Sequence, residues 1–325
     1  MKLSRRHLLQ LSAGALALAP IRSTARGQSY PSQPIHFVVP FPPGGVSDVI
    51  ARQVGQWLSD RLGQPFVIEN RGGAGGNIGT EAVVNAPADG YTLLLDGSVN
   101  AVNATLYPNL RFNYLRDMSP VGSVFRAAHI MEVPPSFPAK TVPEFIAYAR
   151  AHPGEINMAS AGVGTLSHMA GELFCLLAGL KLVHVPYRGA GPALTDLLAG
   201  QVQVMFDNAA TSTEHVHAGR LHALAVTTSR RIDALPEVPS VGEFVAGYEA
   251  SNVNGIAVPA MTPAEIIIKL NTELNAILDD PRTKARFAEL GGAAMIGSST
   301  DYARFLADET DKWARVVKAA GLKPD

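Results

Sequence analysis

Cysteine is almost absent from this chain, and its absence limits the kinds of protein the chain can be. The 325 residues include one cysteine, Cys175, so no disulfide can form within the chain. Cys175 stands in an apolar helical pattern, where a small buried side chain is the simplest interpretation. Charged residues are also scarce at 17%, whereas 47% of the chain is hydrophobic, a composition typical of a globular protein with a large core.

The chain also lacks an excess of basic residues, since 27 lysines and arginines stand against 28 aspartates and glutamates. Five of the basic residues fall within positions 1–27, where no acidic residue occurs. A chain that begins at Gln28 therefore has 22 basic and 28 acidic residues, a net charge of −6. This balance, without any basic stripe, argues against a nucleic acid partner.

Long hydrophobic runs are limited to one, which lies near the N-terminus. Residues 8–21 are mostly apolar and follow Arg5 and Arg6. The run is too short to span a bilayer and has the basic, apolar and small-residue order of a secretory signal. We predict that residues 1–27 are a signal peptide, cleaved after position 25 or 27. The two arginines resemble a twin-arginine signal, although Gln10 replaces the usual lysine; a structural N-terminal helix is the alternative.

Glycine and proline, in contrast, are plentiful, and three prolines and two glycines cluster in one turn, 40–45, that organises the rest of the chain. The apolar run 36–39 predicts a buried strand, which stops at Pro40 because proline cannot donate to a sheet. Gly44 and Gly45 follow, and an apolar period of 3.6 residues predicts a helix over 46–62. Backbone N–H groups at such a helix start attract an anion. A plain strand-to-helix connection is the alternative.

Strands alternate with helices in the first third of the chain. Apolar strands are predicted over 36–39, 66–70 and 91–95, which favours right-handed βαβ units on a parallel sheet. The loops after these strands carry Gly44, Asn77 and Ser98. Ligands of such sheets bind beyond the carboxyl ends of the strands, so we expect the three loops to converge there.

A second region repeats this design. Strands are predicted over 156–159, 183–186, 201–207 and 221–226, with helices over 166–177 and about 194–198. We place one passage between domains near 121–133 and a second from 232 onward, where the chain is proline-rich. The predicted domains are 28–126 with 232–325, and 127–231. Helices over 263–278 and 302–320 are expected to pack on the first domain.

The order of motifs resembles that of tripartite tricarboxylate transporter substrate-binding proteins, the Bug or TctC-like family. The resemblance rests on ordered motifs that cover nearly the whole mature chain: 40–45 with Asp48 and Arg52, 69–71 with 75–79, 89–93, 184–189 with 192–198, and 224–227 with 235–239.

The resemblance implies an α/β fold: a two-domain periplasmic binding protein of the Venus-flytrap, type II-like kind, with parallel-rich sheets flanked by helices. It implies a small carboxylate ligand (a di- or tricarboxylate, an acidic amino acid or an aromatic acid), no cofactor, a monomer, and TctA/TctB-like membrane transporter subunits or a sensor kinase as partner. Carried over by position, the implied ligand contacts are Phe41, Gly44, Gly45, Asp48, Asn77, Ser98, Ser160, Gly164, Thr165, His168, Tyr187 and Asp207.

Three positions depart from the family pattern. Gly72 stands where proline is frequent, Cys175 where lysine is frequent, and Val253 where tryptophan is common. We expect Val253 to reshape one wall of the cleft.

Several of these residues have structural alternatives. Asp48 could only cap the first helix, Asp207 could only end a strand, and His168 could make a structural hydrogen bond. Arg188 could pair with a carboxylate, but a surface position is the preferred interpretation. We therefore expect backbone N–H groups near Gly44, Gly45 and Gly164 to hold the carboxylate.

An exported α/β enzyme or a ligand sensor is the rival class. A hydrolase elbow is missing, because Met158 precedes Ser160 where glycine is required. A dinucleotide turn at 73–75, with Asp96 downstream, fails at its third glycine, where Ile78 stands. The histidines at 215, 217 and 222 match no strong metal signature, so surface positions are expected and no metal is predicted.

Overall fold

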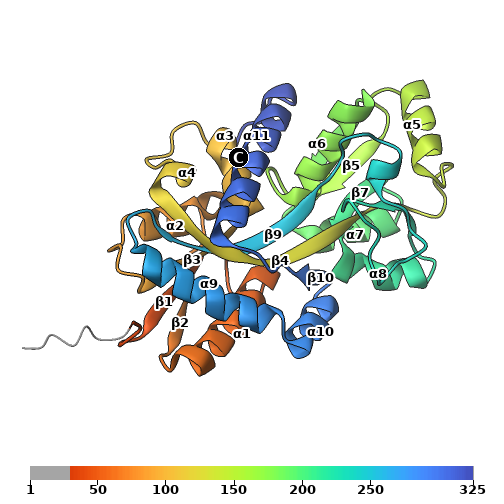
Figure 1. The fold of residues 1–325 in the computed structure, drawn as a ribbon. Helices are drawn as coiled ribbons and strands as arrows, with labels where there is room; N and C mark the ends of the chain where they lie inside the picture. Colours follow the sequence, from red (N-terminus) through yellow and green to blue (C-terminus); the bar gives the residue numbers. More distant parts are fainter. Residues whose placement is uncertain (1–29, 325) are drawn as a thin grey trace, which may run out of the picture.

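The computed structural model describes residues 30–324, and within them ten strands form one strongly curled sheet (Figure 1). The strand order is β2-β1-β3-β9-β4-β7-β5-β6, and β8 and β10 also pair with β4. The strands are β1 (Ile35–Val39), β2 (Phe66–Asn70), β3 (Thr92–Gly97), β4 (Met118–Val133), β5 (Asn157–Ser160), β6 (Val183–Pro186), β7 (Val204–Asn208), β8 (His222–Val226), β9 (Ser251–Pro259) and β10 (Gly292–Ala294).

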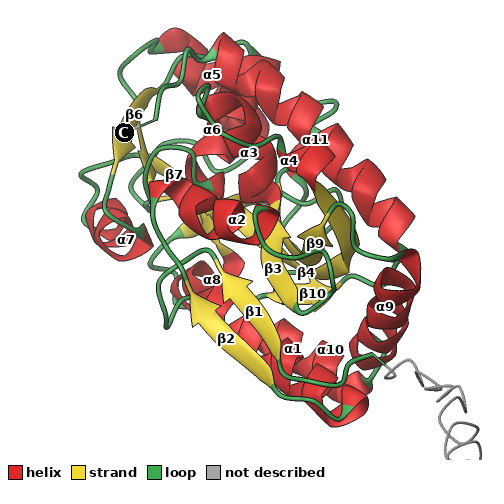
Figure 2. Cartoon of the chain, turned by 90° about the vertical axis from the view of Figure 1, so that its left-hand side faces the viewer, coloured by secondary structure: helices red, strands yellow, loops and turns green. Residues whose placement is uncertain are grey.

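Helices cover both faces of this sheet (Figure 2). They are α1 (Val46–Leu62), α2 (Asn77–Val84), α3 (Ser98–Leu106), α4 (Tyr114–Asp117), α5 (Val142–Ala151), α6 (Leu166–Ala178), α7 (Ala190–Leu198), α8 (Ala209–His217), α9 (Ala264–Leu278), α10 (Pro281–Glu289) and α11 (Ser299–Ala319), with short 3₁₀ turns at Ala74–Gly76 and Val241–Glu243.

The first lobe contains β1, β2, β3, β9, β10 and the first part of β4. Strand β1 is parallel to both β2 and β3, whereas β9 is antiparallel to β3 and β4. Alternate residues of β1 enter different cores: Phe37 packs with α1, α9 and α10, and Val38 packs with α2 and α11. This alternation lets helices pack on both faces of the sheet.

The second lobe contains β5, β6, β7, β8 and the last part of β4. Strands β5, β6 and β7 are parallel, and β7 and β8 are antiparallel to β4. Helices α5 and α6 cover one face, and α7 and α8 cover the other. The chain is thus a two-domain α/β fold, as the sequence predicts.

Strand β4 belongs to both lobes. Its residues up to Ala128 pair with β9, and from His129 onward they pair with β7. The return passage lies between β8 and β9, where Thr227 bonds to the backbone of both His129 and Ala250. The domain bounds 28–126 with 232–325, and 127–231, stay a prediction.

Helix α11 crosses both lobes, whereas we expected it to pack on the first alone. Tyr302 and Leu306 lie in the first-lobe core, but Trp313 and Val316 lie in the core of α5 and α6. Helix α9 packs on the first lobe, as predicted.

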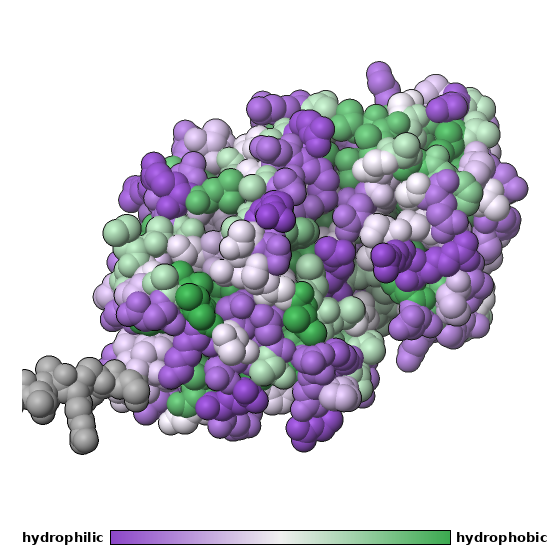
Figure 3. Space-filling model, viewed as in Figure 1, coloured by the Kyte–Doolittle hydropathy of each residue, from purple (hydrophilic) through white to green (hydrophobic). Residues whose placement is uncertain are grey.

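The face shown in Figure 3 carries hydrophobic residues in separate patches between hydrophilic ones. Over residues 30–324, no helix combines the length and apolarity that a bilayer span requires. The predicted signal peptide lies outside the described residues.

Candidate functional site

The β1–α1 turn leaves a helix N-terminus open. Strand β1 ends at Val39, and α1 begins at Val46 with Gly45 as its N-cap. No side chain caps this end, and no heavy atom lies within 4 Å of the position that a Cβ on Gly45 would occupy. The first-turn N–H groups of α1 therefore lie beside open space, where they can donate to an anion.

Asp48 stiffens this turn from within. One of its oxygens accepts from the Gly44 N–H at 2.9 Å and the Arg52 Nε at 3.0 Å, and the other accepts from the Asn70 Nδ2 at 2.9 Å. Hydrogen bonding to Arg52 lowers the pKa of Asp48 to about 2. Because all of these bonds are to the chain itself, the Asp48 carboxylate stabilises the loop. This role is close to the helix-capping role that was the alternative to ligand contact.

Helix α2 packs directly against this turn. A Cβ on Gly79 would lie 2.7 Å from the Arg71 carbonyl oxygen and 2.9 Å from the Pro40 Cα, so only glycine permits the approach. The first residue of α2, Asn77, is 5% exposed. Its Oδ1 accepts from the Asn103 Nδ2 at 3.1 Å, and its own Nδ2 has no partner. Asn77 therefore offers a buried, unused donor.

The start of helix α3 contacts strand β9, which follows the return passage between the lobes. A Cβ on Gly97 would lie 1.9 Å from the Val253 carbonyl oxygen. The Ser98 hydroxyl bonds to the Ser251 carbonyl at 3.3 Å and accepts from the Val253 N–H at 3.2 Å. Ser98 thus fastens α3 to β9. Val253 itself is fully buried in the core with Tyr302, which corrects our expectation that it lines a cleft wall.

The loop that follows β5 in the second lobe is closed by its own side chains. The Gly164 N–H donates to the His168 Nδ1 at 3.2 Å. Thr165 caps α6 by accepting from the His168 N–H, and its hydroxyl donates to the Gly162 carbonyl at 2.7 Å. A Cβ on Gly164 would lie 2.6 Å from Leu106 of α3, so this loop touches the first lobe.

His168 and Ser160 are also engaged internally. The His168 ring stacks on His184 with 3.6 Å between centroids and an 8° tilt, and its Nε2 lies 3.3 Å from the Glu172 Oε1. The Ser160 hydroxyl lies 2.6 Å from the His184 Nε2. Only 1% of the His168 surface is exposed, which fits the structural alternative, and its role as a ligand contact stays a prediction.

The β6–α7 turn resembles the β1–α1 turn more closely. Gly189 is the N-cap of α7, and no side chain caps it. Arg188 is exposed and forms no ion pair within residues 30–324. The Tyr187 hydroxyl donates to the Asp196 Oδ2 at 2.7 Å, and this bond raises the pKa of Tyr187 to about 12. Tyr187 therefore turns its hydroxyl toward α7.

Asp207 lies near the carboxyl end of β7 and is bonded to helix α8. It is 2% exposed, and its carboxylate accepts from the Thr211 and Ser212 hydroxyls at 2.6 and 3.2 Å. Asn208 caps α8 by accepting from the Ala210 N–H at 2.9 Å. Burial under α8 gives Asp207 a structural setting.

These contacts change the set of donors that we expected for a carboxylate. The Gly44 and Gly164 N–H groups are already donated to Asp48 and His168. Gly45 remains a candidate donor site. The starts of α2 at Gly76 and of α7 at Gly189 are added to it, because they also have no side-chain cap. The sequence analysis missed Asn70 and Asn103, which position Asp48 and Asn77. An asparagine at the last position of a predicted strand was the available signal for Asn70.

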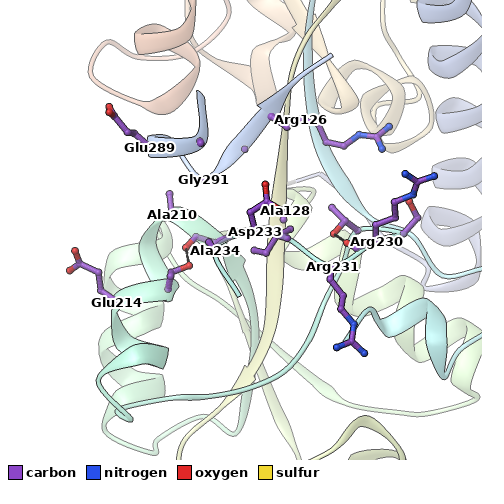
Figure 4. A pocket seen from close by; sticks show the side chains of 18 residues that line it. Arg126, Ala128, Ala210, Glu214, Arg230, Arg231, Asp233, Ala234, Glu289 and Gly291 are labelled. Carbon is purple, nitrogen blue, oxygen red and sulfur yellow. Dashed lines mark hydrogen bonds between the residues drawn. The ribbon is translucent and has the colours of Figure 1, made fainter. Parts of the chain in front are cut away.

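A separate pocket of about 740 Å³ lies where the lobes meet at β4 (Figure 4). Its walls come from β4, α8, the passage 228–234 and the segment from α10 to β10. Small residues such as Ala128, Ala210 and Gly291 form much of it. None of the twelve predicted ligand residues lines this pocket, so it is distinct from the glycine turns.

The structure does not favour the dinucleotide site or the histidine metal site that the sequence offered as alternatives. Asp96, the acidic residue of the dinucleotide alternative, is 1% exposed and accepts hydrogen bonds from Tyr114 and Tyr302. Of the three histidines, His217 and His222 contact the carbonyl oxygens of Ala234 and Lys140, which lie on different segments. Over residues 30–324, no group of three potential ligands could hold a metal ion.

Comparison with known proteins places the chain in a family. The family whose sequence profile matches residues 50–322 is described as the tripartite tricarboxylate transporter family receptor, TctC. The protein BugT of Bordetella pertussis is 38% identical over 313 residues, which cover 95% of each chain. The chain belongs to the TctC family.

Solved structures of similar proteins agree with this membership. The R. palustris protein Rpa4515, solved with adipate, has a TM-score of 0.78 and 34% identity, with 91% of this chain and 100% of that chain covered. MatC from Rhodopseudomonas palustris, solved with malate, has a TM-score of 0.73 and 29% identity, with 89% and 100% covered. The TctC family comprises solute-binding receptors, and a periplasmic location is typical of it.

Proposed function

We propose that this protein is an exported solute-binding protein that captures a small carboxylate between its lobes and delivers it to a tripartite tricarboxylate transporter without turning it over. The observation that carries the proposal is the set of uncapped helix starts at glycines: α1 and α2 in the first lobe and α7 in the second. All three follow the carboxyl ends of strands, β1, β2 and β6, where parallel sheets bind ligands. TctC relatives with adipate and malate support a carboxylate ligand.

The carboxylate is held by N–H groups of the first turn of α1, beginning at Gly45, with the unused Nδ2 of Asn77 as a candidate neighbour. Hydrogen bonds to a charged group contribute about 1.5–3 kcal/mol each, so a few approach the roughly 8 kcal/mol of a micromolar site. Phe41, partly buried beside α1, supplies apolar contact. Closure of the second lobe, led by α7, excludes water.

A thermal-shift screen of di-, tri- and aromatic carboxylates tests this function. A ligand at about a hundred times its dissociation constant stabilises the folded state by about 2.7 kcal/mol, so a hit raises the melting temperature by a few degrees. Mass spectrometry of the bound fraction is expected to recover the ligand unchanged. Conversion of the ligand by the purified protein would place it among enzymes.

Export is tested on the full-length chain expressed in a Gram-negative host. We expect periplasmic protein that begins after position 25 or 27, because residues 1–27 have the layout of a signal peptide. N-terminal sequencing that finds Met1 on the periplasmic protein would contradict this.

A further inference from the structure

Two carboxyl groups are buried together in the second lobe. Glu132 on β4 is 0% exposed, and Asp207 on the neighbouring β7 is 2% exposed. Asp207 pairs with Ile130 and Glu132 pairs with Met205, so the two acids lie on the same face of the sheet, one diagonal step apart. Side chains at that spacing reach each other.

A single hydroxyl group joins the two acids. The Ser212 Oγ lies 2.8 Å from the Glu132 Oε1 and 3.2 Å from the Asp207 Oδ2. A serine hydroxyl carries one hydrogen, which can fill only one of these two contacts at a time. A second proton on either carboxyl group completes the row of three oxygens, with the acid donating to Ser212 and Ser212 donating to the other acid.

No cation offsets the two acids. Neither Glu132 nor Asp207 forms an ion pair with a lysine, arginine or histidine over residues 30–324. His129 is 6% exposed with an unpartnered Nδ1, and burial lowers its pKa to about 4, so it is neutral at neutral pH. Other titratable or charged groups on the packed elements are Arg126 of β4, Glu214, His215 and His217 of α8, and His222 of β8. His217 and His222 each contact a backbone carbonyl.

We propose that Glu132 keeps a proton beside Asp207 and that this proton clamps the first turn of α8 to β4, the strand that belongs to both lobes. Two adjacent buried carboxylates cannot both ionise without a large cost. Burial is the leading cause that raises the pKa of Glu132 well above its ordinary value of 4.5, and Asp207 adds to it. The extra proton in the folded protein stabilises it at low pH, and this stability is lost as pH rises through the folded pKa.

The clamp also bears on the contact between the lobes. Ala210, in the first turn of α8, packs against Gly291 of the first lobe so closely that a Cβ on Gly291 would lie 2.6 Å from the Ala210 Cβ. Release of Ser212 loosens the turn that makes this contact. The protonation state of the pair thus sets how firmly α8 is held at the lobe junction.

Infrared spectroscopy tests for the proton without any ligand. A protonated carboxyl group has a carbonyl band that ionised groups lack. At about pH 7 most carboxyl groups are ionised, but Asp96, whose pKa is raised to about 7, also contributes to a residual protonated band. Measured on an Asp96→Asn background, this band is expected to lose intensity in Glu132→Gln. A spectrum without such a band, or a band unchanged in both Glu132→Gln and Asp207→Asn, would overturn the proposal.

The pH dependence of unfolding tests the clamp. Glu132→Gln keeps an acceptor for Ser212 but carries no charge, and Glu155→Gln, at an exposed position, is the matched control. From about pH 5.5 to about pH 8.5 we expect the folding equilibrium constant of the wild type and the control to fall at least tenfold further than that of Glu132→Gln.

Hydrogen exchange over residues 209–213 extends the test to α8. We expect protection factors there to fall at high pH in the wild type and to stay constant in Glu132→Gln. Equal pH dependence in wild type and Glu132→Gln would overturn the clamp. If Glu132→Gln does not fold, the pH dependence of unfolding and of hydrogen exchange is compared between the wild type and Asp207→Asn. The infrared band of the Asp96→Asn protein then tests the proton directly. These outcomes do not depend on whether the protein binds a carboxylate.

Discussion

The two lobes begin their helices differently at the edge where they face each other. In the first lobe α1, α2 and α3 all start at glycines, which have no side chain to cap the helix, although the Asn100 Oδ1 accepts from the Gly97 N–H at the start of α3. In the second lobe Thr165 and Asn208 cap α6 and α8, and α7 alone starts at an uncapped glycine. A capped helix start has already used donors that an anion needs. The difference supports our proposal that the first lobe holds the charge and that the second lobe closes over it.

The largest expected effect comes from filling the start of α3. In Gly97→Val the new Cβ would lie 1.9 Å from the Val253 carbonyl oxygen, so β9 must move. We expect a loss of about 3 kcal/mol or more in the free energy of unfolding, measured by urea titration.

Gly189→Val is the matched change in the second lobe. No heavy atom lies within 4 Å of its Cβ position, and only its φ of 116° opposes a side chain. Such strain costs about 1–3 kcal/mol. An equal or larger loss for Gly189→Val would show that packing at Gly97 does not distinguish the lobes.

The pH dependence of unfolding compares Asp96, a buried acid of the first lobe, with Glu132 of the second lobe. Burial raises the pKa of Asp96 from 3.8 to about 7, although hydrogen bonds from Tyr114 and Tyr302 oppose the rise. The folded state therefore binds the proton more tightly than the unfolded chain, and the resulting stability is lost as pH rises from 3.8 through 7.

We expect Asp96→Asn to lose less stability than the wild type over that interval, measured by urea unfolding at each pH. The variant keeps one carbonyl oxygen that accepts from one tyrosine, and its Nδ2 can donate to the hydroxyl oxygen of the other. Parallel curves for wild type and variant would mean that Asp96 is ionised throughout.

A smaller effect is expected from removing a cap in the second lobe. Thr165→Ala leaves the His168 N–H at the start of α6 without its acceptor, and loss of such a cap costs about 1 kcal/mol. Thr165→Ser keeps the hydroxyl and serves as the control. In the first lobe, Gly45→Ala removes no cap, so we expect a change of only a few tenths of a kcal/mol. Similar losses for Thr165→Ala and Gly45→Ala would contradict the contrast between the lobes.

The sequence predicted local structure well where one segment decides it. The helix over 46–62 and its end at Gly63 follow from an apolar period and a glycine, and the structure has these bounds. Strand β9 was missed, because Asn252, Asn254 and Gly255 weaken its pattern and its pairing with β3 and β4 is formed across distant parts of the chain. Helix α8 was missed because threonine, serine and histidine are poor helix formers.

The loops that form the candidate site could be predicted from the sequence. Which backbone N–H groups in them are free to bind a ligand could not. The glycine turns mark which loops meet at the strand ends. Which N–H groups remain unused depends on side chains that fold back on them, such as Asp48 on Gly44 and His168 on Gly164. Those contacts appear only when the loop conformation is known.

The proposal that the open start of α1 holds the carboxylate has a direct test. Calorimetry with the carboxylate that gives the largest thermal shift tests it on Gly45→Asn, whose side chain can cap α1 and take the donors that the ligand would use. Gly45→Ala is the matched control, since a Cβ there meets no atom within 4 Å. The account predicts at least about a tenfold weaker affinity for Gly45→Asn, or roughly 1.4 kcal/mol, and a smaller loss for Arg188→Ala. Unchanged affinity in Gly45→Asn, with a larger loss in Arg188→Ala, would mean that an arginine of the second lobe holds the charge.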